Sequence, residues 1–335
     1  MSFKSLFLWF SCLGLFVSCS YNPFEVDITN VKTGIGYLNL DSMLVKTSPN
    51  DIPLMNERCK FELGELYAYQ LGYCFRFAND ADTTVQKGLS LYFSDPGIQI
   101  IERELGSQFS SVAEYNKAID DGFRRLKVHF PKMKVPKKVV YLNSLLNFSV
   151  FSTGEQIGVG LEWHLGPDSK WLKKLPEQLT PQWKKEAMLK EYIARDAIVS
   201  WLETHIVPKT DGDLASEMVR WGKIIYFLQA AFPGSEPHSL LRYTPKEYEW
   251  AIENEQNIWD YLIKQNMLFK INDLNERNLL SEGPFTPGIQ EKSPDRLGQF
   301  VGYKMVKKYM DIRRISLEEL RTASYSDVLS EYEID

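Results

Sequence analysis

The four histidines of the chain are the residues best suited to acid–base or metal chemistry. No two of them have the spacing of a metal-binding motif; they are His129, His164, His205 and His238. His164 is the most informative, because it follows Trp163 at the end of a predicted strand, where a general base can be held in place. Since no second histidine adjoins it, the sequence favours a structural role for His164 and keeps catalysis as the alternative.

Two glycine-containing segments resemble parts of a dinucleotide-binding motif but are incomplete. Gly34-Ile-Gly36 and Gly158-Val-Gly160 lack the third glycine, whose positions hold Asn39 and Trp163. The chain also has no Gly-rich phosphate loop ending in Lys and Ser or Thr, and no Gly-x-Ser-x-Gly nucleophile motif. We therefore expect no cofactor, no metal and no set of catalytic residues.

The start of the chain has the features of a bacterial export signal. Lys4 precedes an apolar run over residues 6–17, which is too short to span a bilayer as a permanent helix. A small residue directly before Cys19 resembles the lipobox, whose cysteine thiol receives a diacylglyceryl group and becomes the new N-terminus. We predict a lipoprotein signal peptide at residues 1–18, lipidation of Cys19 with acyl chains such as palmitate, and a tether at residues 19–24.

The other cysteines of the mature chain are predicted to be free thiols. Of the four cysteines, Cys12 leaves with the signal peptide and Cys19 is lipidated, so only Cys59 and Cys74 can pair. Both lie in a segment with helical periodicity. In a continuous helix they would be about 22 Å apart, whereas a disulfide needs Cα atoms within about 7 Å.

The mature chain is acidic. Cleavage removes Lys4 and no acidic residue, which leaves 38 basic and 44 acidic residues and a net charge of −6 with neutral histidines. This balance gives no reason to expect a nucleic-acid partner. We therefore assign attachment to the membrane to the lipid rather than to a basic surface.

The strands are predicted at the start and in the middle third of the chain. Alternating apolar residues indicate a strand within residues 31–40. Three further β-rich runs, at residues 138–142, 146–151 and 156–162, are separated by short turns and can form a small meander.

Most of the remaining chain has helical periodicity. Ile119, Phe123 and Leu126 are expected on the inner face of one helix, and Gly298 and Gly302 are expected to let a neighbour approach another closely. The helical segments are residues 53–125 with breaks, 181–205, 214–232, 245–265, 296–310 and 317–332. No internal repeat or Gly/Ser/Pro-rich linker divides the chain, so we predict one α+β domain at residues 25–335, predominantly helical with a small β-sheet in its middle third.

The last third of the chain carries a series of distinctive segments. They are Tyr243-Thr-Pro-Lys-Glu-Tyr-Glu-Trp250, Gly283-Pro-Phe-Thr286, Ser293-Pro-Asp-Arg-Leu-Gly298 and Val306-Lys-Lys-Tyr-Met310. Together with the lipobox they resemble the gliding motility lipoprotein GldB family of Bacteroidetes-type bacteria, over nearly the whole mature chain. The resemblance implies a lipid-anchored cell-envelope protein with partners in the gliding or secretion machinery and without established enzymology.

Two short motifs gain meaning from this resemblance. Ser20-Tyr-Asn-Pro23 lacks the acidic run that marks surface export of lipoproteins in such bacteria, so the chain is expected on the periplasmic side of the outer membrane. Asp41-Ser-Met43 and Asp82-Thr-Thr84 match the three-residue O-glycosylation pattern of their exported proteins. Ser42 and Thr83 are therefore possible glycan sites, provided that they lie in exposed turns.

The family also resembles, distantly, zinc metallopeptidases with a His-Glu-x-x-His helix. The corresponding helix would begin at Leu214, and its motif positions hold Ser216, Glu217 and Arg220. Serine is a poor zinc ligand and arginine is permanently charged, so this degenerate zincin-like core should not bind metal. Arg220 is expected to pair with Glu217, and the helix to lie near the strand that carries Leu161.

Two hypotheses of different classes follow. The first is a non-catalytic, lipid-anchored protein that contacts other components of the envelope. The second is an envelope hydrolase, peptidase or glycan-directed, that uses His164 with a distant carboxylate. The lack of a convergent His, Cys or Ser arrangement in the sequence favours the first.

Overall fold

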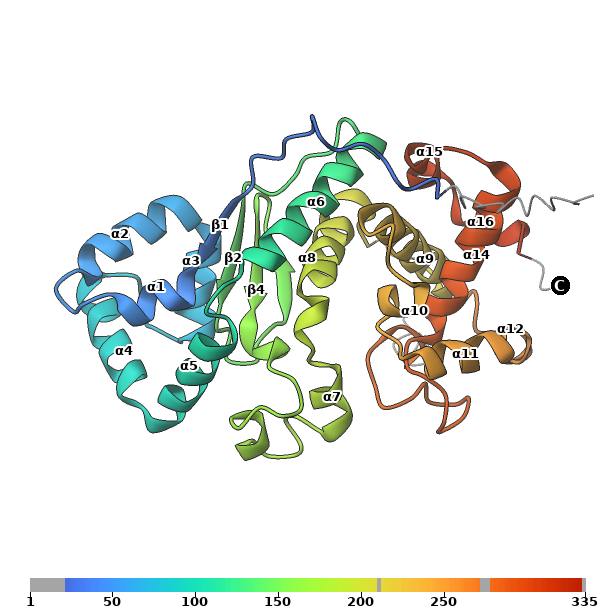
Figure 1. Cartoon of the computed structure of the whole chain (residues 1–335). Helices are drawn as coiled ribbons and strands as arrows, with labels where there is room; N and C mark the ends of the chain where they lie inside the picture. The colour runs from blue at the N-terminus through green and yellow to red at the C-terminus, as the bar shows by residue number, and fades with distance from the viewer. Residues whose placement is uncertain (1–21, 210–211, 272–277, 333–335) are drawn as a thin grey trace, which may run out of the picture.

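The computed structural model describes residues 22–209, 212–271 and 278–332 (Figure 1). The predicted signal peptide and Cys19 lie outside the described residues. Within these ranges the chain is predominantly helical with a small mixed sheet in its middle third, so the predicted α+β fold is confirmed. No helix of the described ranges combines the length and apolarity needed to cross a membrane.

The first half of the chain supplies one group of helices. They are α1 Leu40–Lys46, α2 Ile52–Leu63, α3 Glu65–Tyr69, α4 Asp82–Ser94, α5 Pro96–Gln108 and α6 Ala113–His129. Gly64 separates α2 from α3 with a positive φ of 48°, so the helix that holds Cys59 does not run straight to Cys74. Both cysteines are free and buried, as predicted.

The second half supplies the larger helical group. It comprises α7 Gln182–Ala187, α8 Ile193–Trp201, α9 Leu214–Ala231, α10 Pro237–Leu240, α11 Pro245–Glu253, α12 Glu255–Lys264, α14 Leu297–Arg313, α15 Leu317–Thr322 and α16 Tyr325–Ser330. α9 is buried around most of its circumference and packs most extensively on α14. A helix that is buried on most sides needs neighbours on most sides, which α6, α8 and α14 provide.

A four-stranded sheet joins the two groups of helices. Its strands are β1 Gly36–Asn39, β2 Lys138–Leu142, β3 Val150–Ser152 and β4 Gln156–Gly160. The order is β1-β2-β4-β3, with β1, β2 and β4 parallel and β3 antiparallel to β4. The predicted meander is therefore wrong, because residues 143–149 carry the chain past the end of β4 before β3 begins.

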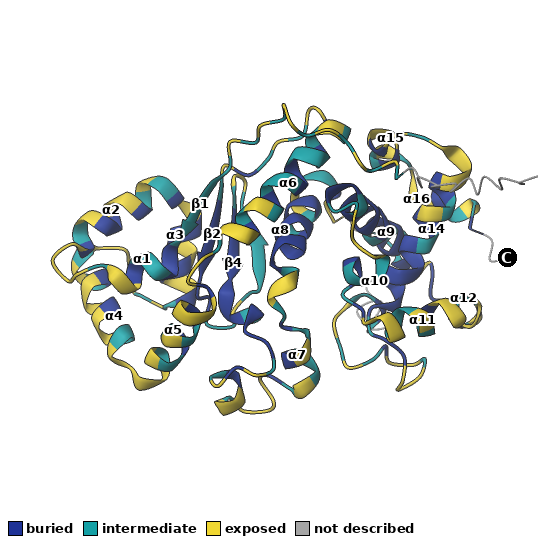
Figure 2. Cartoon of the chain, in the orientation of Figure 1, coloured by how far each residue is buried: buried dark blue, intermediate teal, exposed yellow. Residues whose placement is uncertain are grey.

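Both faces of the central strands β2 and β4 are buried, and the edge strands β1 and β3 are half-buried (Figure 2). Val139, Tyr141 and Val159 belong to one apolar cluster with α6, α8 and α9, whereas Val140 and Leu142 belong to a second with α1, α2 and α4. Successive side chains of a strand point to opposite faces, so the two clusters share the same strands. Parallel strands normally require this cover on both sides.

The segment before β1 forms an extended strap, defined here as residues 22–35. Arg124 of α6 donates from Nε to the Val31 carbonyl at 2.8 Å and from Nη2 to the Ile28 carbonyl. The side chain of Asn22 donates to the Pro233 carbonyl just after α9, at 2.8 Å. The strap thus crosses one side of the molecule, from the end of α9 over α6 to β1 (Figure 1).

The backbones of α9 and α14 approach each other directly at two glycines. A Cβ atom added to Gly302 would lie 1.8 Å from the Met218 carbonyl oxygen, and one added to Gly222 would lie 2.0 Å from the Gly302 carbonyl oxygen. Gly298 is similarly close to the Leu279 carbonyl oxygen, at 2.9 Å. The predicted close approach at Gly298 and Gly302 is confirmed.

Gly302→Ala should destabilise the fold, because the added methyl group meets backbone that cannot rotate away. We expect a loss on the order of 1–3 kcal/mol in the free energy of unfolding, measured by urea denaturation. Gly106→Ala is the matched control: Gly106 is exposed in α5 with no atom within 4 Å of its added Cβ. That variant should gain about 0.5–1 kcal/mol from helix propensity. Equal stability of the two variants would mean that α9 and α14 are not packed this closely.

Candidate functional site

Polar side chains gather where the three parallel strands end. Asp41 follows β1 and Asn143 and Ser144 follow β2, while Glu162 and His164 lie in a short 3-10 turn directly after β4. All five are buried, and we call them the polar centre. The carboxyl edge of parallel strands is where open α/β sheets usually bind ligands. Of this group, the sequence analysis had singled out only His164.

Glu162 holds the loop after β2 against the end of β4. Its Oε1 accepts hydrogen bonds from the backbone N–H of Leu146 at 2.9 Å and of Ser144 at 3.1 Å, and from the Ser144 hydroxyl. Leu145 and Leu146 adopt positive φ angles of 54° and 61°, which are unfavourable for leucine. Burial raises the pKa of Glu162 to about 7, although the donors of Ser144 and Leu146 lower it.

Asp41 of the polar centre forms an acidic pair with the neighbouring Glu102. Glu102 of α5 accepts hydrogen bonds from the Asn143 amide at 3.0 Å and from the Tyr92 hydroxyl at 3.1 Å. Burial and the neighbouring Glu102 raise the pKa of Asp41 well above its usual range, and burial also raises the pKa of Glu102. A protonated Asp41 can donate to Glu102, so the pair shares one proton rather than carrying two charges.

His164 is buried and held in one tautomer. Its Nδ1 lies 3.1 Å from the Leu189 carbonyl oxygen, which only accepts, so we assign the proton to Nδ1 and the lone pair to Nε2. Burial lowers the pKa of His164 to about 4, and the ring is therefore neutral at pH 7. Nε2 is buried without a hydrogen-bond partner in the described part of the chain. Ser149 and Arg242 line the same small cavity.

A charged cluster lies beside His164. Asp196 of α8 accepts from Arg195 at 2.7 Å and from Arg242 at 3.1 Å. Although burial alone would raise the pKa of Asp196, the Arg242 and Arg195 guanidiniums hold it below its usual value. Arg242 also pairs with Glu282 at 3.3 Å. The charge of Asp196 acts on His164, so Asp196 is a counterpart of the distant carboxylate expected for that histidine, but both of its oxygens are engaged by arginines.

The residues of the zincin comparison lie elsewhere. Ser216 lies in the first turn of α9, and its hydroxyl donates a hydrogen bond to the Asp213 carbonyl at 2.7 Å. Arg220 pairs with Glu217 at 3.0 Å, as predicted, and also with Glu203 at 3.4 Å. The helix that packs on β3 and β4 is α8, however, whereas α9 packs on α6, α8 and α14. The expected proximity of this motif to the end of β4 is therefore not found, and the zincin-like core is not supported.

The described ranges contain no group of side chains arranged to bind a metal ion. No group of three or more His, Cys, Asp or Glu side chains is arranged there to hold an ion. Glu162 and the neighbouring Glu102 instead accept hydrogen bonds from within the chain.

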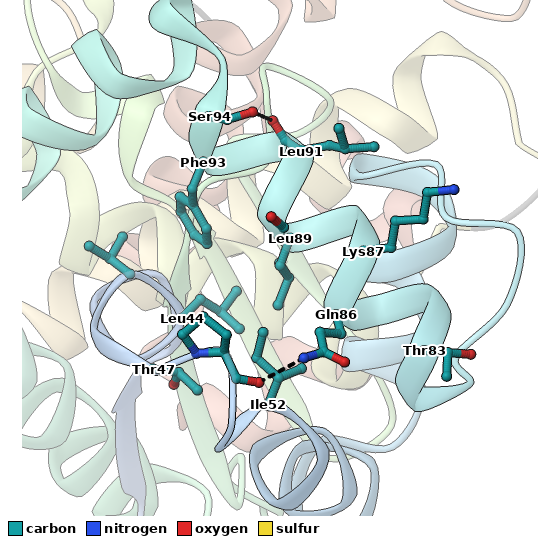
Figure 3. Close-up of a pocket in the computed structure, with 13 residues that line it drawn as sticks. Leu44, Thr47, Ile52, Thr83, Gln86, Lys87, Leu89, Leu91, Phe93 and Ser94 are labelled. Atoms are coloured by element: carbon teal, nitrogen blue, oxygen red, sulfur yellow. Dashed lines mark hydrogen bonds between the residues drawn. The ribbon is translucent and has the colours of Figure 1, made fainter.

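A cavity of about 700 Å³ lies apart from the polar centre, between α1, α2 and α4 (Figure 3). Leu44, Ile52, Leu89 and Phe93 give it an apolar lining. Its size is that of a ligand or peptide groove, but its lining contains no acidic residue and no histidine. We call it the α1–α4 groove. The sequence analysis gave no indication of it, because its walls come from helices whose packing depends on distant contacts.

The two possible glycan sites have different surroundings. Neither lies in a turn: Ser42 is in the first turn of α1 and Thr83 in the first turn of α4. Ser42 is half-buried and its neighbour Asp41 belongs to the polar centre. Thr83 is exposed at the rim of the α1–α4 groove (Figure 3). The surroundings favour Thr83 over Ser42.

Mass spectrometry of the native protein should find an O-linked sugar on Thr83 and none on Ser42, since a modifying enzyme can reach only the exposed motif. Thr83→Val keeps the side-chain shape and should remove the added mass. A bare peptide at Thr83, or a sugar on Ser42, would contradict this prediction.

Glu162→Gln should make stability less dependent on pH. The folded-state pKa of about 7 exceeds the unfolded value of 4.5, so the native state binds this proton more tightly and Glu162 stabilises the fold at low pH. That contribution, on the order of 3 kcal/mol, is lost as pH rises from about 4.5 through about 7. Glutamine can keep the Oε1 acceptor and does not titrate.

The measurement is urea unfolding of both proteins at about pH 5 and about pH 8, in which the decrease should be smaller for Glu162→Gln. Glu155→Gln, a change at an exposed residue, is the control and should follow the wild type. Identical decreases in all three proteins would contradict a raised pKa at Glu162.

Comparison with known proteins identifies the family. The family model described as "Gliding motility protein GldB" matches residues 21–333. No curated protein and no solved structure matches the chain. The match covers all described elements, from the strap to α16. The chain therefore belongs to the family of the gliding motility protein GldB.

Proposed function

We propose that this chain is a lipid-anchored envelope protein that supports gliding motility, or its associated secretion machinery, through protein contacts rather than catalysis. The observation that carries the proposal is the family match, which begins two residues after the cysteine of the lipobox. The family region and the predicted signal together account for nearly the whole sequence. Three acyl chains on Cys19 would make the attachment effectively permanent.

The ion pairs formed by the buried charged side chains support a non-catalytic role. Asp196 is neutralised by two arginines and Arg220 is paired with Glu217. Guanidinium groups do not exchange protons at neutral pH, so these pairs are suited to holding the structure rather than to acid–base steps. Val45 and Leu91, exposed at the α1–α4 groove, provide apolar surface for protein contacts.

The proposed location is the periplasmic side of the outer membrane. The segment Ser20-Tyr-Asn-Pro23 after the lipidated cysteine contains no acidic residue. The family supports association with the envelope, and the leaflet is part of our proposal.

One observation favours a second function, an envelope hydrolase acting on peptides or glycans. The Nε2 lone pair of His164 has no partner among the described residues and lies at the carboxyl edge of the sheet. A general base needs such a free lone pair. Its low pKa of about 4, however, makes this imidazole a weak base, and the carboxylate nearby is held by arginines. We therefore place this function second.

Cys19→Ala should abolish lipidation, because transfer of the diacylglyceryl group requires the thiol. We expect the variant to be unacylated, and uncleaved or mislocalised as a result, and to fail to restore gliding to a strain that lacks the gene. Cys12→Ala is the matched control, since Cys12 lies in the predicted signal peptide and should behave as wild type. Wild-type fractionation and mobility of Cys19→Ala would reject the lipid anchor.

A further inference from the structure

From Asn22 onward the chain is packed against the rest of the folded domain. The Asn22 side chain donates to the Pro233 carbonyl at 2.8 Å and accepts from the Phe24 backbone N–H at 3.0 Å. The Phe24 ring packs edge-on against Tyr226, with ring centroids 5.4 Å apart, and against His129 at 6.4 Å. These contacts join the start of the strap to α9 and to the end of α6.

The rest of the strap is held along α6. Besides Arg124, Lys127 donates to the Lys32 carbonyl at 3.2 Å, and Thr33 donates to Asp120. β1 then enters the sheet at Gly36. The strap is therefore a bound segment and not a flexible linker.

The connection between lipid and body is consequently short. Only three peptide steps separate Cys19 from Asn22, and even a fully extended chain of that length spans no more than about 11 Å. A body held this closely cannot turn freely on its anchor. The surface around Asn22 must therefore lie near the lipid headgroups.

The surface around Asn22 has a suitable composition. Residues 127–134, which include the His129 that contacts Phe24, contain three lysines and no acidic residue, in a mature chain whose net charge is −6. Lys132 is exposed there, and Val128 is 38 % exposed. At the end of α14, Ile312 is 49 % exposed. Its neighbour Asp311 lies close to Tyr226, whose pKa is raised by burial and also by the charge of Asp311. Lysine side chains are attracted to anionic lipid headgroups, and aliphatic side chains can be buried where the headgroups meet the acyl chains.

The acidic groups at this surface are partly compensated, although Glu25 and Asp27 of the strap are exposed. Asp311 pairs with Lys307 at 2.7 Å, and Arg313 pairs with Glu331. Arg314 is exposed at the last turn of α14. We define the anchor face as the start of the strap with Lys127, Val128, Lys132, Ile312 and Arg314.

The direction of the strands shows which end of the molecule is opposite. β1 begins where the strap ends, and the Lys137 N–H bonds to the Glu155 carbonyl at 2.7 Å beside the start of β2 and β4. The amino ends of the parallel strands thus lie on the side of the strap. Their carboxyl ends, with the polar centre, and α7 lie at the other end of the molecule (Figure 1).

We propose that the anchor face rests on the phospholipid surface, so that the carboxyl edge of the sheet and α7 point away from the membrane. The proposal rests on lipidation of Cys19, the anchor of the proposed function. It assigns the membrane as the partner of the anchor face and leaves the opposite end of the molecule for protein partners.

Site-specific fluorescence quenching tests this orientation. The lipidated full-length protein is placed in vesicles of phosphatidylethanolamine and phosphatidylglycerol that contain a headgroup-attached nitroxide. Ile312→Cys and Lys132→Cys report on the anchor face. Leu179→Cys is the matched control, because Leu179 is a similarly exposed aliphatic residue just before α7. The native Cys59 and Cys74 are buried, and burial raises the pKa of their thiols to about 11 and about 12, so the label should react with the introduced cysteine.

We expect several-fold stronger quenching at residues 312 and 132 than at residue 179. Equal or reversed quenching on vesicles that carry the protein would overturn the orientation while leaving the anchor intact. A protein that fails to float with the vesicles would overturn both the anchor and the orientation. A flexible Gly/Ser linker of about ten residues inserted after Ser20 should keep flotation and reduce the contrast. An unchanged contrast would contradict orientation by the short tether.

Discussion

Parallel pairing of three short strands is the constraint on which the rest of the structure depends. β1, β2 and β4 are hydrogen-bonded side by side, with Leu38 opposite Val140 and Tyr141 opposite Val159. Such strands must be covered on both faces, and the two groups of helices do this with two apolar clusters. The shared direction also separates the ends of the sheet: the strap enters at the amino edge, and the polar centre forms at the carboxyl edge.

The buried groups of the polar centre make contacts that hold the structure. Glu162 binds the backbone of a loop whose leucines have unfavourable positive φ angles, and this loop carries the chain across the sheet to β3. His164 joins the segment before α8 to the end of β4, and Asp196 joins α8 to Arg242, which follows α10. A buried polar group without a hydrogen bond destabilises the folded state, and each of these contacts gives such a group a partner. Among the described residues, the Nε2 atom of His164 and the Oε2 atom of Glu102 are buried without such a partner.

Local patterns predicted local structure well. β2 has the predicted bounds, and Ile119, Phe123 and Leu126 are fully buried on the inner face of α6. The strand order was not predictable from such patterns, because a β4 inserted between β2 and β3 depends on contacts between distant residues. The polar centre was missed for the same reason: Asp41 and Asn143 each follow a predicted strand and Glu162 ends one, but only parallel pairing brings those ends together. Likewise, periodicity indicated two helices after β4 without showing that α8, and not α9, packs on the sheet.

The most direct test of a structural rather than catalytic role is the substitution His164→Asn. The amide nitrogen of asparagine can replace Nδ1 as donor to the Leu189 carbonyl, whereas the Nε2 lone pair is removed. We expect His164→Asn to keep a melting temperature close to that of the wild type and to restore gliding, while His164→Ala, which loses the hydrogen bond, unfolds at a lower temperature. A His164→Asn protein that is as stable as the wild type but does not support gliding would contradict the structural role and favour a hydrolase.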